Sequence, residues 1–168
     1  MKWVMLTVLA LGLAGAAAAQ REAASKLKIG QPATFRGTQT VPRARLRITL
    51  VAYVDPVHSR LERPRRGTRF VAFKLRIANL TKQRWQGTIA SWATLVGLHG
   101  RRYDVTTSGI VQPWAVKLPS LDEGTTIEGK QRVVGYLGWI LPKKLELREF
   151  RYQLELGSDV AAWVLPRR

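Results

Sequence analysis

Two stretches of this chain alternate apolar and polar side chains with a period of two, and this pattern constrains the fold more than any other feature. The stretches run from Ala44 to Val54 and from Arg69 to Ala78. Successive side chains of a β-strand point to opposite faces, so this period is typical of a strand with one buried face. The predicted inward positions are Leu46, Ile48, Leu50, Ala52 and Val54, and then Val71, Phe73, Leu75 and Ile77. The predicted outward positions are Arg45, Arg47, Thr49, Val51 and Tyr53, and then Phe70, Ala72, Lys74 and Arg76.

Other segments carry weaker strand signals, and none is typical of a long amphipathic helix. A loop rich in proline and arginine, Asp55 to Gly67, and an irregular crossing, Gln112 to Asp122, separate some of them. Several short strands with turn signals in one chain of this size predict an all-β antiparallel sandwich of about seven strands, in a single domain at residues 29–165. The further strands are expected at Thr88 to Leu98, Arg101 to Thr106, Thr125 to Trp139 and Lys144 to Leu156.

Three local features refine this prediction. His99-Gly100 is expected to form a tight turn in which Gly100 has a positive φ. The apolar phase changes within the last strand, which predicts a β-bulge at Glu149-Phe150. Asn79 follows a strand, where its side chain can bond the downstream backbone and start a turn.

The N-terminus has the three parts of a secretory signal. Lys2 precedes an apolar run that ends in small residues, and Ala17 and Ala19 suit a cut before Gln20. We therefore expect a cleaved signal peptide at residues 1–19, a flexible tail at residues 20–28 and export to the periplasm or the medium, with no integral membrane segment after cleavage. An uncleaved anchor helix is the alternative. The chain has no cysteine, so neither disulfides nor a lipid-modified cysteine are available.

The chain is strongly basic, with 28 Lys and Arg against 11 Asp and Glu and a net charge of +17. Such a charge favours polyanions as partners, and export makes anionic envelope polymers a more natural partner than DNA. The alternative is that the many arginines reflect the amino-acid usage of the organism and only keep the protein surface solvated. The candidate anion-binding residues fall in three groups, which are the loop residues Arg60, Arg63, Arg65, Arg66 and Arg69, the outward strand residues Arg45, Arg47, Lys74 and Arg76, and the pair Arg101 and Arg102.

The residues do not indicate a catalytic or metal site, and we expect no cofactor and no enzyme activity. The two histidines, His58 and His99, fall in predicted turns, and crowding of Asp55, His58 and Ser59 in one loop is poor geometry for a triad. The carboxylates of Asp122, Glu123 and Glu128 cluster near a strand start, where pairing with arginine is the simpler interpretation. Trp85 and Trp114 have polar neighbours and are candidates for exposed aromatic rings, which can stack on sugars or bases.

In their order along the chain, several motifs resemble a family of bacterial secreted immunoglobulin-like domains of unknown function. Members are often labelled telomeric repeat-binding factor 2, and the family is related to small secreted immunoprotective antigens. The segments that carry the resemblance are Gly67 to Val71 with Asn79-Leu80-Thr81, Leu95 to Tyr103, and Leu121 to Gly124 with Glu128-Gly129 and Pro142. The resemblance implies an immunoglobulin-like sandwich and no chemistry. Two departures are the missing lipobox cysteine and the Glu123-Gly124 pair, which stands where Pro-Gly is usual.

Two functions follow as hypotheses. The first is an exported, non-enzymatic interaction module of the cell envelope that contacts an envelope protein or an anionic polymer through a basic surface. The second is a nucleic-acid-binding protein that acts outside the cytoplasm. A hydrolase is a distant third. Binding to phosphates weakens steeply as salt rises, so salt dependence separates polyanion binding from binding to an apolar protein patch.

Overall fold

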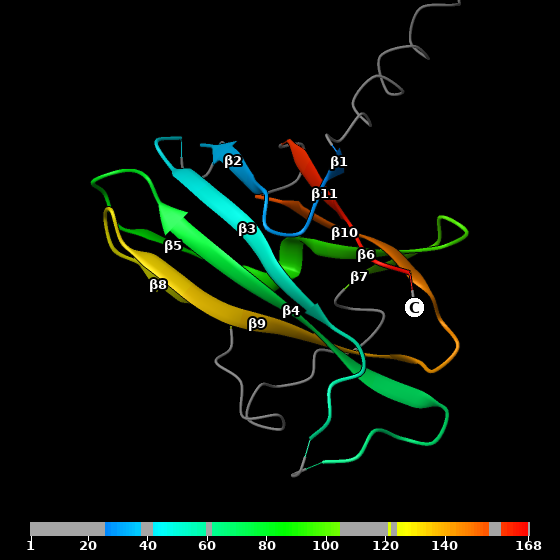
Figure 1. Ribbon diagram of the computed structural model, residues 1–168. Helices are drawn as coiled ribbons and strands as arrows, with labels where there is room; N and C mark the ends of the chain where they lie inside the picture. Colours follow the sequence, from blue (N-terminus) through cyan, green and yellow to red (C-terminus); the bar gives the residue numbers. More distant parts are fainter. Residues whose placement is uncertain are drawn as a thin grey trace, which may run out of the picture.

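The computed structural model describes residues 26–37, 42–59, 62–104, 121, 124–154 and 159–167, and these form an all-β sandwich (Figure 1). One sheet has four strands in the order β2 (Pro32–Arg36), β3 (Arg45–Val54), β4 (Thr68–Asn79) and β9 (Arg132–Pro142). The other has five, in the order β1 (Lys26–Leu27), β11 (Val160–Val164), β10 (Leu147–Gln153), β6 (Ala93–Gly97) and β7 (Arg102–Asp104). A two-stranded ribbon, β5 (Trp85–Gly87) and β8 (Thr125–Ile127), and a 3-10 turn at Ala90–Trp92 complete the described part.

Aromatic rings form the centre of the core between the two sheets. Phe73 of β4 stacks on Phe150 of β10 with ring centroids 4.9 Å apart, and Trp139 of β9 meets Phe73 edge-on at 5.2 Å. Trp163 of β11 is fully buried beside Phe150, at 5.9 Å. All four inward positions predicted for β4 are buried in this core, which confirms the alternation that predicted the sandwich.

The alternation in β3 breaks at one point, and the prediction beyond it was wrong. Leu50 lies opposite Leu75, but Ala52 lies opposite Lys74, so the register shifts by one residue between them. Such a bulge exchanges the two faces of the strand beyond it. Tyr53 therefore points inward and stacks on Phe73, with centroids 5.2 Å apart, whereas Val54 points outward and is 39% exposed.

Two aromatic residues that were expected at the surface are buried. Phe70 points to the outer face of β4 as predicted, but Val57 and Ile140 cover it and leave it 2% exposed. Trp85 is 5% exposed and belongs to the main core, because the β5–β8 ribbon turns it inward. Trp114 lies outside the described residues.

The predicted bulge in the last long strand exists, one step earlier than expected. Leu147 lies opposite Gly97 and Glu149 lies opposite Val96, which leaves Arg148 as the extra residue. The bulge returns Phe150 and Tyr152 to the core, where both are buried.

Both predicted turns are present. Gly100 has a φ of +78°, and the amide of Gly100 donates to the carbonyl of Gly97 at 2.9 Å. The Asn79 side chain is 2% exposed and makes four hydrogen bonds. Its Nδ2 donates to the carbonyls of Gln83 and Ile127, and its Oδ1 accepts from the backbone N–H and the hydroxyl of Thr81. The turn after β4 is thereby tied to the β5–β8 ribbon.

The first strand corrects the expected tail. Lys26 and Leu27 pair in parallel with Ala162 and Trp163, so the end of the segment 20–28 belongs to the five-stranded sheet. The predicted signal peptide, Asp122, Glu123 and most of the crossing from Gln112 to Asp122 lie outside the described residues. Within the described ranges, no helix has the length and apolar character that crossing a bilayer requires.

Candidate functional site

The outer face of the four-stranded sheet carries a cluster of cationic side chains. Arg45 and Arg47 on β3 and Arg76 on β4 are exposed, and Lys74 on β4 is half-buried. Strands β3 and β4 are neighbours, so the stripe that the sequence predicted from these four residues is present. Sequence analysis missed two more residues on the same face, although period-two alternation in their strands gave the signal for both. We call the six residues the basic face: Arg36, Arg45, Arg47, Lys74, Arg76 and Arg132.

Strand register sets the spacing within the basic face. Arg36 of β2 lies directly opposite Arg45 of β3. Arg47 and Arg132 both lie opposite Ala78, from the two sides of β4. Strands lie about 4.8 Å apart, and successive outward residues of one strand are about 7 Å apart. The basic face therefore measures about 14 Å across the strands and about 20 Å along them.

Like charges on adjacent positions cost stability, and the four strands contain no carboxylate that would compensate them. Arg36 and Arg45 face each other across a strand pair, where like charges are destabilising. No acidic residue occupies an outward position of the four strands, and in the described part of the chain none of the five arginines has an ion-pair partner. Lys74 lies over the ring of Tyr136, 5.6 Å from its centroid.

On the five-stranded sheet, by contrast, arginines form ion pairs with a carboxylate. Glu149, only 3% exposed, is held on its outer side by Arg151 at 2.8 Å and by Arg148 at 3.5 Å. Positive charge on that sheet is thus partly neutralised by a carboxylate, whereas the basic face has none. The excess of arginine is distributed unevenly between the two outer surfaces of the sandwich.

The predicted loop group separates into different environments. Arg63, Arg65 and Arg66 are exposed in the β3–β4 connection, and Arg60 lies outside the described residues. This connection joins the end of β3 to the start of β4, whereas Arg45 lies at the start of β3 and Arg76 near the end of β4. Phe70, which is covered by its apolar neighbours, lies between the loop arginines and the basic face. Loop and basic face are therefore separate clusters.

Arg69 does not belong to the exposed loop group, because it is buried in an ion pair. Its side chain is 4% exposed and its partner Asp55 is 1% exposed. Nε donates to Asp55 Oδ1 at 2.6 Å and Nη2 to Oδ2 at 2.9 Å, which is a two-pronged contact. The remaining donors bond the carbonyl oxygens of Pro142 and Leu145, at the crossing between β9 and β10. Arg69 therefore joins the two sheets and is not available to a soluble anion.

The last predicted pair lies on the β6–β7 hairpin. Arg101 is exposed and lies over the ring of Tyr103, 5.4 Å from its centroid. Arg102 is exposed on β7 opposite Val96, on the edge strand of the five-stranded sheet. Neither residue is on the basic face.

Tyr53 completes the buried network around Asp55. Its hydroxyl donates to Asp55 Oδ2 at 2.5 Å. Burial, with the hydrogen bond to Asp55, raises the pKa of Tyr53 well above its usual value. The hydrogen bond to Asp55 also raises the pKa of Arg69, so the guanidinium stays charged. Burial alone raises the pKa of the Tyr152 hydroxyl.

We expect the protein to lose stability as the pH rises above about 10, the ordinary pKa of tyrosine. Above that pH the tyrosines of the unfolded chain release their protons, while folded Tyr53 and Tyr152 keep theirs because their pKa values are raised. The unfolded state then binds fewer protons, so the stabilisation present below pH 10 declines with further increase. Urea unfolding between about pH 8 and pH 11 measures the slope.

The variant Tyr152→Phe provides the control. Within the described residues the Tyr152 hydroxyl is buried without a hydrogen-bond partner, so its removal leaves no other group unsatisfied. The variant should be as stable as the parent or more stable at neutral pH, with a smaller loss above pH 10. An unchanged slope would contradict the assignment.

The described residues do not bring together a set of metal-binding side chains. His58 and His99 are exposed in loops, and across the described ranges no three His, Asp or Glu residues gather at metal-binding distance. Asp55, which a triad with His58 would require, already binds Arg69 and Tyr53. Glu128 forms an exposed pair with Arg84 at 3.6 Å.

Comparison with known proteins supports the fold and leaves the activity open. No family model matches the sequence, and no curated protein sequence matches it. The structure is similar to MPT63, a secreted protein of Mycobacterium tuberculosis, with a TM-score of 0.56 and 14% identity over 84% of this chain and 98% of that one. A putative lipoprotein of Bacillus subtilis gives 0.49 and 14% identity over 70% of this chain and 35% of that protein. An uncharacterised β-sandwich protein of Clostridium difficile gives 0.48 and 10% identity. The likeness to MPT63 establishes a sandwich of the kind found in a bacterial secreted protein, which is coarser than the family that the motifs suggested.

Proposed function

We propose that this protein is an exported, non-enzymatic module of the cell envelope that binds an anionic polymer through the basic face. The observation that carries the proposal is the placement of six cations on one sheet surface, whose four strands contain no carboxylate. A compositional excess alone gives no reason for opposed arginines such as Arg36 and Arg45, which cost stability in the unbound protein. A bound polyanion would remove that cost.

We also propose that the sandwich is immunoglobulin-like, which its strand orders support. The strand orders β3-β4-β9 and β11-β10-β6-β7 correspond to the orders A-B-E and G-F-C-C′ of an immunoglobulin sandwich. Export is supported by the predicted signal peptide and agrees with the secreted character of MPT63.

The chemistry of the face favours a flexible phosphodiester chain. Arginine offers a planar fork that suits phosphate. A flexible chain can follow the twisted surface of a sheet, whereas a rigid duplex cannot. Tyr136 beside Lys74 offers a ring on which a base could stack, so single-stranded nucleic acid is the competing ligand. A teichoic-type poly(glycerol phosphate) chain has the same charges and no bases.

We expect the variant Arg47→Gln/Arg76→Gln/Arg132→Gln to bind poly(glycerol phosphate) about 100-fold more weakly at low salt, from about 1 kcal/mol for each lost cation. The slope of log affinity against log salt should fall by about 2. Isothermal titration calorimetry at several salt concentrations measures both quantities. All three side chains are exposed, so the fold should be retained.

The matched control is Arg63→Gln/Arg65→Gln/Arg66→Gln, which removes the same charge from the loop. It should reduce affinity less than about fivefold, through the general field alone. If the loop variant lost binding and the sheet variant kept it, the basic face would not be the binding site. Tighter binding of oligodeoxythymidylate than of poly(glycerol phosphate) would favour the nucleic-acid alternative.

A further inference from the structure

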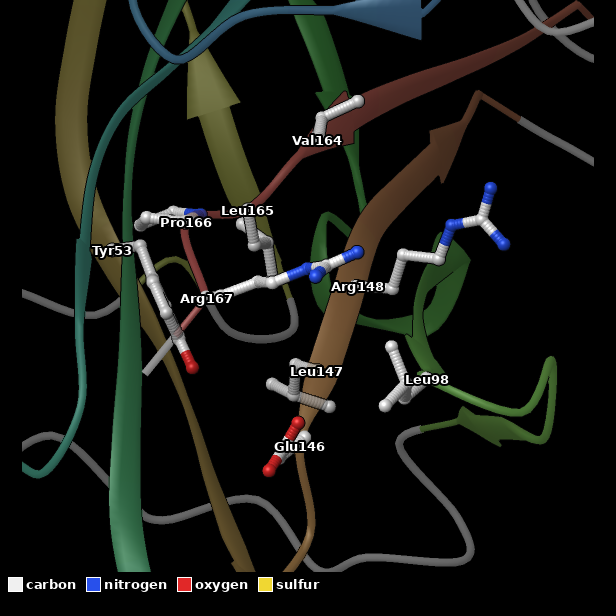
Figure 2. Close-up of a pocket in the computed structure, with 9 residues that line it drawn as sticks. All are labelled: Tyr53, Leu98, Glu146, Leu147, Arg148, Val164, Leu165, Pro166 and Arg167. Carbon is white, nitrogen blue, oxygen red and sulfur yellow. The ribbon is translucent and has the colours of Figure 1, made fainter.

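A pocket of about 340 Å³ opens at the end of the sandwich where β10 begins and β11 finishes (Figure 2). Polar and apolar groups share its lining, and two of the few large exposed apolar side chains belong to it: Leu98 at 41% and Val164 at 43%. Its volume is at the lower end of the range typical of small-molecule sites. The lining residues are Tyr53, Leu98, Glu146, Leu147, Arg148, Val164, Leu165, Pro166 and Arg167.

The polar groups of the pocket are two arginines and one glutamate. Arg148 is the extra residue of the β10 bulge, and bulges commonly redirect a side chain toward a site. Its contact with Glu149 is long, 3.5 Å, and that carboxylate is bound more closely by Arg151. In Figure 2 the Arg167 guanidinium lies between Leu165 and Leu147, and the Glu146 carboxylate lies apart from both arginines.

Glu146 also lines a second hollow, of about 370 Å³, which Leu98 borders as well. That hollow contains the cations Arg101 and Lys144, so the glutamate has positive neighbours there. The first pocket therefore combines aliphatic side chains with two arginines.

The buried ion pair gives this pocket a rigid frame. The Tyr53 side chain is held in place by its hydrogen bond to Asp55 and its stacking on Phe73. Arg69 binds Asp55 and also the carbonyl of Leu145, the residue before Glu146 of the pocket lining. The rim backbone is paired as well, since Leu98 N–H donates to Glu146 O at 3.0 Å and Leu165 N–H donates to Arg148 O at 2.9 Å. A preformed site of this kind loses little conformational entropy when it binds a ligand.

From this arrangement we infer that the pocket binds a compact amphipathic carboxylate, with its apolar body against Leu98, Val164 and Leu165 and its carboxylate at Arg148 and Arg167. Guanidinium groups match a carboxylate in geometry and charge, and the apolar lining accommodates a short hydrocarbon chain or a single ring. This site is separate from the basic face, so its failure would leave the proposed function untouched.

Octanoate is the test ligand, and octanol of the same chain length is the control that lacks the charge. Calorimetry should show saturable 1:1 binding of octanoate in the millimolar range and at least tenfold weaker binding of octanol. Arg167→Gln and Leu98→Gln should each weaken octanoate binding about tenfold, because the first removes a charged donor and the second part of the apolar wall. Both residues are exposed, and circular dichroism checks the fold.

Arg47→Gln on the basic face supplies the matched control for general charge. It should leave octanoate affinity within about twofold of the parent. Arg47 lies six residues along β3 from Tyr53 of the pocket, about 20 Å away, and salt screens charges separated by more than about 10 Å. Equal binding of octanol, an equal loss in Arg47→Gln and Arg167→Gln, or no saturable binding of octanoate would each overturn the inference.

Discussion

Arg69→Met should lower the free energy of unfolding by about 3–5 kcal/mol, the cost of leaving one charge of a buried pair without its partner. The variant removes both hydrogen bonds to Asp55 and leaves the carbonyls of Pro142 and Leu145 without their donor. Methionine fills much of the same volume, so the loss reports the polar contacts more than a cavity. Chemical denaturation at neutral pH measures it.

A double-mutant cycle separates the ion pair from the packing around it. Asp55→Leu removes the carboxylate, so the double variant Asp55→Leu/Arg69→Met contains no unpaired charge. We expect the double variant to be more stable than the sum of the two single losses predicts, by at least about 1 kcal/mol, because each single change has already broken the same contact. Strict additivity, or a loss below about 1 kcal/mol in Arg69→Met, would show that the network does not hold the sheets together.

Asn79→Ala should cost about 3 kcal/mol. Four hydrogen bonds end on this side chain, and alanine leaves two carbonyls and the Thr81 N–H without their partner in a region that water reaches poorly. Each unsatisfied group costs on the order of 1 kcal/mol or more. Urea unfolding of the variant measures the loss.

Asn79→Asp is the informative comparison, because aspartate keeps the acceptor for Thr81 and loses the donor. Its carboxylate would face the carbonyl oxygens of Gln83 and Ile127, so we expect a loss at least as large as that of alanine. Thr81→Val, which removes one hydroxyl, should cost only about 1 kcal/mol. A stable Asn79→Asp protein would mean that the amide donor has no structural role.

Local patterns in the sequence predicted the sandwich because the alternation of apolar and polar residues within a strand indicates which of its faces is buried. Val71, Phe73, Leu75 and Ile77 are inward as expected, and the turns at Asn79 and Gly100 depend on short-range chemistry. Tyr53 was placed on the wrong face, because the bulge after Leu50 is a property of the β3–β4 pairing and leaves little trace in β3 alone.

Residues whose environment depends on distant partners were the ones that sequence reasoning misplaced. Arg69 was grouped with exposed arginines. Its hydrogen-bond partners, however, are Asp55, 14 residues earlier, and the carbonyl of Leu145, 76 residues later. Trp85 has polar neighbours in sequence, and its burial depends on the pairing of β5 with β8.

The basic face shows the same division between local and distant information. Four of its six residues, Arg45, Arg47, Lys74 and Arg76, were predicted from alternation, on condition that their two strands are neighbours. Arg36 and Arg132 joined it only through the pairing of β2 and β9 at the sides of the sheet. Alternation assigns a face within one strand, whereas the order of strands across the sheet comes from tertiary structure.

Backbone amide shifts recorded during titration with poly(glycerol phosphate) test most directly whether the basic face is the binding surface. We expect the largest changes at residues 33–36, 45–49, 74–78 and 132–136, which surround the six cations on the four strands. Changes confined to the loop at residues 62–66 or to the five-stranded sheet would contradict the account.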